Sequence, residues 1–226
     1  MPIKETPKAK QTREHILNTA LELFAAKGYQ ETTMRDIAAA ADCSLGLAYR
    51  YFAQKEEMIL ALYERLTIEL REEVSTLPPE TLAQRFSATV RACLARLALH
   101  RATMGALFGA GIAPDSPVAV LGDQVAGVRT RVWQIFLTVI EGAKDAPREK
   151  QARDLATVFY AVHLTLVLFW IQDRSPQQQR TEELLKFSEE TLGRMRPLLN
   201  LPPVTKSLAR LSRILMPMFG PSEGVQ

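Results

Sequence analysis

The sequence has few cysteines and histidines, the residues that build disulfide frameworks and many metal centres, and it lacks the patterns of β-strands. Its 226 residues include two cysteines, Cys43 and Cys93, which lack a metal-binding spacing. Runs in which valine, isoleucine and threonine alternate with polar residues, which are typical of β-strands, are also missing. We therefore expect free thiols, no bound metal and a protein built from helices.

Catalytic patterns are equally scarce. The sequence has no Ser/His/Asp set, no glycine-rich loop for a phosphate and no histidine–carboxylate spacing for a metal. Its histidines, His15, His100 and His163, are far apart in the chain. We therefore expect neither enzymatic activity nor a cofactor.

A large excess of one charge is missing as well. The 28 basic and 25 acidic residues leave a net charge of +3. Over residues 1–55, eight basic residues stand against six acidic ones. Any binding to a nucleic acid must therefore depend on where the charges lie rather than on their number. The N-terminal residues show no apolar run of the kind found in secretory signals, so we expect a cytoplasmic protein.

Only one long apolar run is present, at residues 155–171. Its length lies at the short end of what can cross a bilayer, it contains His163, and polar segments flank it. We expect a buried helix here and no association with a membrane.

Helical periodicity, in contrast, is abundant. Apolar residues recur every three or four positions along most of the chain, which predicts an all-α protein of about nine or ten helices. Residues 1–10 are polar and predict a flexible arm, followed by a helix over about residues 12–27 that ends at Gly28. A final amphipathic helix is expected near residues 206–216.

Residues 33–55 have the pattern of two short helices joined by a tight turn. Thr32 or Thr33 is expected to cap the first helix and Ser44 the second, since threonine and serine are favoured at helix N-caps. The second helix carries Arg50 between Tyr49 and Tyr51. This pattern is typical of a helix-turn-helix whose second helix enters the major groove of DNA.

A family resemblance is carried by an ungapped block of residues: Ala20, Leu23, Phe24, Gly28, Tyr29, Thr32, Thr33, Ile37, Ala38, Ala41, Ser44, Tyr49, Tyr51, Phe52, Lys55 and Glu56. Through them, residues 12–63 resemble the DNA-binding domain of TetR-type transcriptional regulators. The resemblance implies a three-helix DNA-binding domain at residues 11–55. It also implies a larger helical ligand-binding and dimerisation domain at residues 56–226, with the fourth helix as the linker.

The resemblance also implies which residues touch DNA. Thr33 would contact a phosphate, Arg35 would reach a base, and Ser44 would cap the recognition helix. The positions that would face the groove are Leu45, Gly46, Leu47 and Arg50, and those that would hold the DNA backbone are Tyr49, Tyr51 and Lys55. Many relatives have polar residues where this chain has the two leucines. Because leucine cannot hydrogen-bond a base edge, readout would depend on Arg50, Arg35 and DNA shape.

Two features near this motif have alternative interpretations. Lys4, Lys8 and Lys10 form either an arm near DNA or a solvated tail. Cys43 is either a small core residue or a redox sensor, and no neighbouring charge pattern favours the second interpretation.

The helices around residues 154–173 and 176–196 have more apolar surface than one stripe requires. The apolar run has no polar face to present to water, so every side of this helix must be buried. We expect the protein's own core to bury one side and a second subunit to bury the other. In TetR-type regulators the corresponding helices form a dimer interface. A homodimer would place two recognition helices about 34–36 Å apart, the spacing of a palindromic operator.

The resemblance further implies a pocket for a small lipophilic effector. Residues suited to line it are His100, Met104, Leu107, Phe108, Trp133, Phe136, Phe159, Tyr160 and His163. The alternative is that these residues simply form the core, with His163 as a structural or interface histidine.

The function predicted from the sequence is that of a ligand-responsive transcriptional regulator, most simply a repressor that a lipophilic effector releases from DNA. The alternative is a constitutive or architectural DNA-binding protein with a filled core and no effector.

Overall fold

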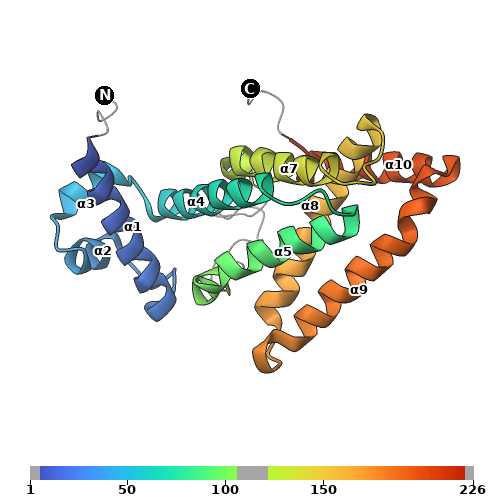
Figure 1. Cartoon of the computed structure of the whole chain (residues 1–226). Coiled ribbons are helices and arrows are strands. Elements are labelled where there is room, and N and C mark those ends of the chain that lie inside the picture. Colours follow the sequence, from blue (N-terminus) through green and yellow to red (C-terminus); the bar gives the residue numbers. More distant parts are fainter. Residues whose placement is uncertain (1–5, 106–121, 222–226) are drawn as a thin grey trace. The chain divides into compact units, whose positions relative to one another are not determined.

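The chain is all-α, as predicted (Figure 1). A computed structural model describes residues 6–105 and 122–221, and no strand occurs among them. The α-helices are α1 (Pro7–Lys27), α2 (Met34–Ala40), α3 (Leu45–Tyr51), α4 (Lys55–Ser75), α5 (Leu82–Ala98), α7 (Ala126–Glu141), α8 (Glu149–Gln172), α9 (Gln179–Met195) and α10 (Pro202–Phe219). Residues 101–105 are also helical, and 3₁₀ turns lie at Asp123–Val125, Pro176–Gln178 and Arg196–Asn200.

The helices form two compact units. Unit 1 comprises Met1–Arg65 and Leu99–Gly122, and unit 2 comprises Leu66–Ala98 and Asp123–Gln226. Helix α4 therefore contributes its first half to unit 1 and its second half to unit 2. Residues 99–105 also belong to unit 1, where the Thr103 hydroxyl donates to the Leu21 carbonyl.

Helix α1 begins earlier than predicted, so the assignment of residues 7–10 to a flexible arm is wrong. The Thr6 hydroxyl accepts a hydrogen bond from the Ala9 N–H and caps the helix, and Pro7 occupies its first turn. Proline is well suited to this position because the first amides of a helix have no carbonyl partner. Gly28 ends the helix as expected, with a φ of +92° that a side chain would resist.

Helices α2 and α3 form the predicted helix-turn-helix. Thr33 and Ser44 are the N-caps, each accepting from a backbone N–H three residues on. Between the helices Asp42 adopts a left-handed backbone conformation that turns the chain. The buried Ala48 and Phe52 hold α3 against the rest of unit 1.

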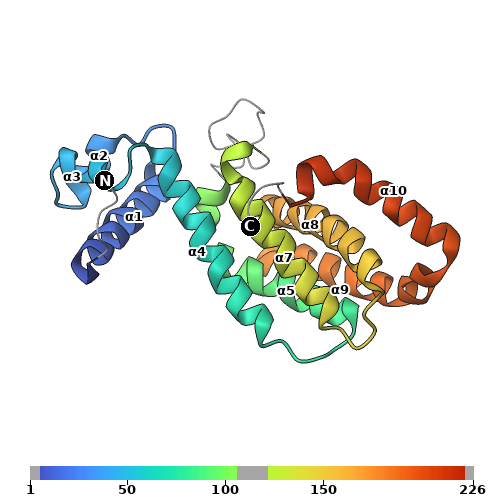
Figure 2. The ribbon, with the colours of Figure 1, turned by 90° about the horizontal axis from the view of Figure 1, so that it is seen from above.

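Unit 2 is a layered helical domain. Helix α7 packs on α8, α10 packs on α8, and α9 packs on α5 (Figure 2). An aromatic cluster joins three of these helices, with the Phe86 ring 4.4 Å from that of Phe159 and 5.9 Å from that of Phe136. Helix α10 is longer than the predicted segment at residues 206–216. It packs on this core through the buried Leu208 and through the Phe219 ring, which contacts the ring of Tyr160.

The long apolar run lies within α8, which buries Phe159, His163 and Trp170. By length and composition α8 is the one helix among the described residues that could cross a membrane, and half of the apolar window is buried inside the protein. Partial burial of this kind is typical of a core helix, which passes the same length and composition test.

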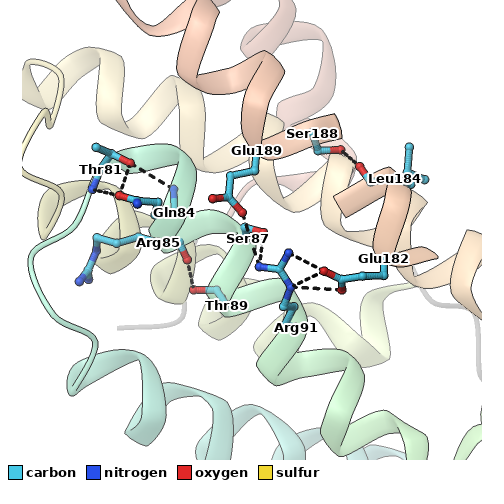
Figure 3. A network of polar contacts seen from close by, with 10 residues as sticks. All are labelled: Thr81, Gln84, Arg85, Ser87, Thr89, Arg91, Glu182, Leu184, Ser188 and Glu189. Carbon is cyan, nitrogen blue, oxygen red and sulfur yellow. Dashed lines mark hydrogen bonds and ion pairs between the residues drawn. The ribbon is translucent and has the colours of Figure 1, made fainter. Parts of the chain in front are cut away.

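Two arginines of α5 tie unit 2 together (Figure 3). The Arg85 guanidinium is buried and donates to the carbonyls of Leu77, Pro78 and Val139, joining the segment after α4 to the last turn of α7. Arg91 pairs with Glu182 at 2.9 Å and with Glu189 at 3.5 Å, and so fastens α5 to α9. Because the macrodipole makes a helix C-terminus electronegative, the end of α7 is a favourable place for the Arg85 cation.

Candidate nucleic-acid interface

Helix α3 presents most of its surface outward. Ala48 is its only buried residue, whereas Gly46, Tyr49 and Arg50 are exposed. The Tyr49 side chain is 49% exposed, so its hydroxyl is available to a partner and the ring is not a core aromatic. The two leucines, Leu45 and Leu47, are half-buried.

The start of α2 is a capping box. The Thr33 hydroxyl donates to the Asp36 carboxylate at 2.8 Å and accepts from the Asp36 N–H, while Lys27 donates to the same carboxylate at 2.9 Å. The Lys27 hydrogen bond, followed by those from Thr33, lowers the pKa of Asp36 to about 2. The Thr33 hydroxyl is therefore engaged within the protein, and its contact with a phosphate stays a prediction. Arg35, next to this box, is exposed.

The start of α4 is bound to the loop after α1. The Lys55 ammonium donates to the Tyr29 carbonyl at 2.8 Å and lies 4.5 Å from the centre of the Tyr29 ring. The Tyr29 hydroxyl donates to Glu56 at 2.8 Å, and burial, with Glu56, raises the pKa of Tyr29 well above its ordinary value. Lys55 and Glu56 thus position α4, a role that sequence reasoning missed for both residues. A phosphate contact by Lys55 stays a prediction.

The charged groups of unit 1 fall into two sets. Lys27 is paired with Asp36, and Arg65 with Glu14, so a neighbouring carboxylate balances the charge of each of these partly exposed cations. Arg35 and Arg50 make no ion pair with any described carboxylate. The helix-turn-helix therefore offers free positive charge although the chain as a whole is nearly neutral.

The residues predicted to line a pocket are distributed over both units. Phe136, Phe159, Tyr160 and His163 lie together in the buried core of unit 2, where the Phe136 ring is 5.2 Å from His163 and 6.5 Å from Tyr160. Trp133 is also buried there and donates from its indole N–H to the Thr157 hydroxyl at 3.0 Å.

The other predicted pocket residues lie elsewhere. His100 and the buried Met104 belong to unit 1. Leu107 and Phe108 lie outside the described residues.

His163 is the unusual member of the unit 2 core. Its Nε2 lies 3.7 Å from the Cys93 sulfur, and its buried Nδ1 has no hydrogen-bond partner among the described residues. Desolvation by burial lowers the pKa of His163 to about 4 and raises that of Cys93 to about 12. Both groups are therefore neutral near pH 7.

Helices α8 and α9 leave apolar side chains uncovered. Val162, Leu168 and Phe169 of α8 are about two-fifths exposed, and Phe187 of α9 is 63% exposed. Met195 at the end of α9 is also exposed. Singly exposed apolar residues are common, but five on two helices that contact each other suit these helices to a protein partner.

Comparison with known families identifies the chain. Residues 16–62 match the family of bacterial regulatory proteins of the tetR type, and residues 85–202 match the tetracyclin repressor-like C-terminal domain. The second match alone covers more than half of the 226 residues. The chain belongs to the TetR family.

Among the relatives of this TetR-family protein is the HTH-type transcriptional repressor KstR from Rhodococcus jostii. It is 28% identical over 188 residues, which cover 81% of this chain and 84% of KstR. The HTH-type transcriptional regulator TcmR from Streptomyces glaucescens is 33% identical over 108 residues, and this match covers 43% of this chain and about half, 48%, of TcmR.

Solved structures share the fold. A TetR-family regulator from Syntrophomonas wolfei matches with a TM-score of 0.63 and 24% identity, covering 81% of this chain and 95% of that one. FadR from Thermus thermophilus, a TetR-family repressor crystallised with lauroyl-CoA, matches with a TM-score of 0.51 and 23% identity, covering 81% and 92%. With the family match, the exposed recognition helix identifies a DNA-binding transcriptional regulator.

Proposed function

We propose that this protein is a cytoplasmic, ligand-responsive repressor that binds a palindromic operator as a homodimer and is released by a small lipophilic effector. The observation that carries the proposal is helix α3, whose Gly46, Tyr49 and Arg50 are exposed on a well-packed support. Sequence would be read by Arg50 and Arg35, because the two leucines can contact only apolar groups such as thymine methyls. KstR and FadR are both named repressors, which supports the assignment.

The proposed division of labour follows the chain. Residues 11–55 would bind DNA, residues 56–226 would bind the effector and the second subunit, and α4 would link them. Helix α4 suits this role because its first half is fastened to unit 1 by Arg65, which bonds Asn18 and Glu14. Its second half is fastened to α5 through Arg96, which pairs with Glu69 and Glu73.

The effector is proposed to enter the aromatic core of unit 2. The neutral His163, with its unpartnered Nδ1, would supply the polar contact within apolar walls of Phe136, Phe159 and Tyr160. A small number of polar groups among aromatic side chains is the usual composition of a ligand site. FadR was crystallised with lauroyl-CoA, which makes a lipophilic effector reasonable for its relatives.

Release from DNA would be a population shift. Effector binding would favour a state in which α4 alters the spacing of the two recognition helices, so effector and operator would weaken each other by the same coupling free energy. Fluorescence of Trp133 and Trp170, both in unit 2, reports binding independently of DNA. Candidate compounds, including lauroyl-CoA, are screened for a change in this fluorescence. A compound that changes it is expected to lower the affinity of the protein for its operator. An effect on fluorescence with unchanged operator affinity contradicts the release mechanism.

The dimer is tested together with the operator. DNA selected from a random library should contain two inverted half-sites whose centres are one helical turn, about 10 base pairs, or a multiple of it apart. Val162→Arg places a charge among the exposed apolar side chains of α8. The variant should sediment as a monomer, and it should no longer protect both half-sites of the operator in footprinting. Arg153→Ala on the same helix, at an exposed ion pair with Glu149, is the matched control and should stay dimeric. A Val162→Arg protein that still dimerises would contradict the assigned interface.

A further inference from the structure

The first turns of α1 carry cations that the helix-turn-helix does not account for. Lys8, Lys10 and Arg13 lie within the first seven residues of the helix, and its first turn contains no acidic residue. Lys8 and Lys10 are exposed, and none of the three makes an ion pair with any described carboxylate. Glu14, the first acidic residue of α1, forms an ion pair with Arg65 of α4.

Arg13 fixes where this end of α1 lies. Its guanidinium stands 4.7 Å from the centre of the Phe52 ring, in a cation–π contact with the residue that directly follows α3. Phe52 is buried, with only 1% of its surface exposed. Arg13 therefore anchors this part of α1 to Phe52, the residue after the C-terminal end of α3.

Lys10 shares this side of α1. It precedes Arg13 by three residues, so the two side chains are about 60° apart around the helix and one turn apart along it. Lys8 precedes Lys10 by two residues and projects about 160° away from it. By this helical spacing Lys10, and not Lys8, is expected on the side of α1 from which Arg13 contacts Phe52.

We propose that Lys10, positioned by Arg13 on Phe52, extends the DNA interface beyond the helix-turn-helix by contacting a phosphate next to the groove that α3 enters. This proposal rests on the proposed function. The partner is duplex DNA because the free cations Lys10, Arg50 and Arg35 all belong to the unit that carries the recognition helix, whereas cations such as Lys27 are neutralised. A lysine contributes to such a surface as a point charge that displaces a counterion, without reading sequence.

The contact predicts a defined salt dependence. Each phosphate neutralised adds about 0.9 to the slope of log affinity against log salt concentration. In a dimer, Lys10→Gln removes two contacts, so the slope should fall by about 2 and operator affinity at 0.1 M salt should drop by well over tenfold. Affinity for unrelated DNA should fall by a similar factor, because a phosphate contact is blind to sequence.

Lys8→Gln is the matched control, because it removes the same charge from the same end of the same helix on the opposite side. It should leave the slope and the affinity unchanged, and Lys10→Arg should restore both. Circular dichroism of each variant checks that α1 remains folded. Lys10→Gln binding like the unmodified protein, or equal losses in Lys8→Gln and Lys10→Gln, would overturn the proposal. If the unmodified protein does not bind DNA, the proposed function itself fails, which is a distinct result.

Discussion

At the scale of single residues, the structure separates side chains that serve the fold from those free to meet a partner. Lys55 and Thr33 both look like phosphate contacts in the sequence, yet both side chains make hydrogen bonds within unit 1. Tyr49, Arg50 and Arg35 are exposed, as the sequence prediction requires. The distinction depends on neighbours that sequence spacing does not reveal, such as the Tyr29 carbonyl 26 residues from Lys55.

Burial of His163 predicts how the stability of the protein depends on pH. Its folded-state pKa of about 4 lies below the ordinary 6.5, so the unfolded chain binds a proton more readily and stability falls as pH drops from about 6.5 towards 4. This histidine should therefore cost about 2 kcal/mol of unfolding free energy between pH 7.5 and pH 5. Urea unfolding followed by the tryptophan fluorescence of unit 2 measures it. His163→Phe should lose that part of the pH dependence, and parallel pH profiles for the two proteins would contradict the account.

At the scale of elements, helix ends are joined by buried cations. Arg85 links the segment after α4 to the last turn of α7, and burial lowers the pKa of its guanidinium from the ordinary value. Gly142, which follows α7, makes room for it, since an added Cβ would lie 2.5 Å from Arg85 Nη2. The backbone conformation of Gly142 is one that any residue can adopt, so it does not require a glycine. The space needed by the Arg85 side chain does.

Gly142→Ala should therefore destabilise the protein. The guanidinium would have to give up hydrogen bonds to buried carbonyls, at a cost of about 1–3 kcal/mol in urea unfolding. Gly193→Ala is the matched control. Gly193 lies within α9, and an added Cβ there would meet only the Cβ of Ala83 in α5, at an ordinary contact distance of 3.9 Å. The control should be neutral or slightly stabilising, as alanine favours helix over glycine. Equal stability of Gly142→Ala and the unmodified protein would show that Arg85 can move at no cost.

Element boundaries show how far the sequence could predict the fold. The helix-turn-helix and its cap at Ser44 were predicted correctly, because capping and glycine or proline signals are local. For the first cap the sequence left Thr32 and Thr33 open, and the structure has Thr33. The start of α1 was not, because its polar first turn lacks an apolar stripe and depends on Thr6 and Pro7. The position of residues 99–105 in unit 1 depends on long-range contacts such as Thr103 to Leu21, which no local pattern encodes.

At the scale of the whole molecule, two units joined by a continuous helix suit a protein that couples two binding events. Unit 1 carries the helix-turn-helix, and unit 2 carries the aromatic core and the exposed apolar side chains of α8 and α9. The family could be recognised from residues 12–63 because the helix-turn-helix constrains many positions at once. Which ligand or DNA sequence a member binds could not be predicted, because it depends on individual side chains that differ between relatives sharing the fold.

The central claim is that α3 reads a DNA sequence through Arg50, and fluorescence anisotropy with Arg50→Ala tests it most directly. On the selected operator, the variant should bind about 1–3 kcal/mol more weakly than the unmodified protein, while binding to unrelated DNA should change much less. Arg210→Ala, at an exposed position on α10, should bind both DNAs normally. Operator binding by Arg50→Ala that equals that of the unmodified protein would contradict the account.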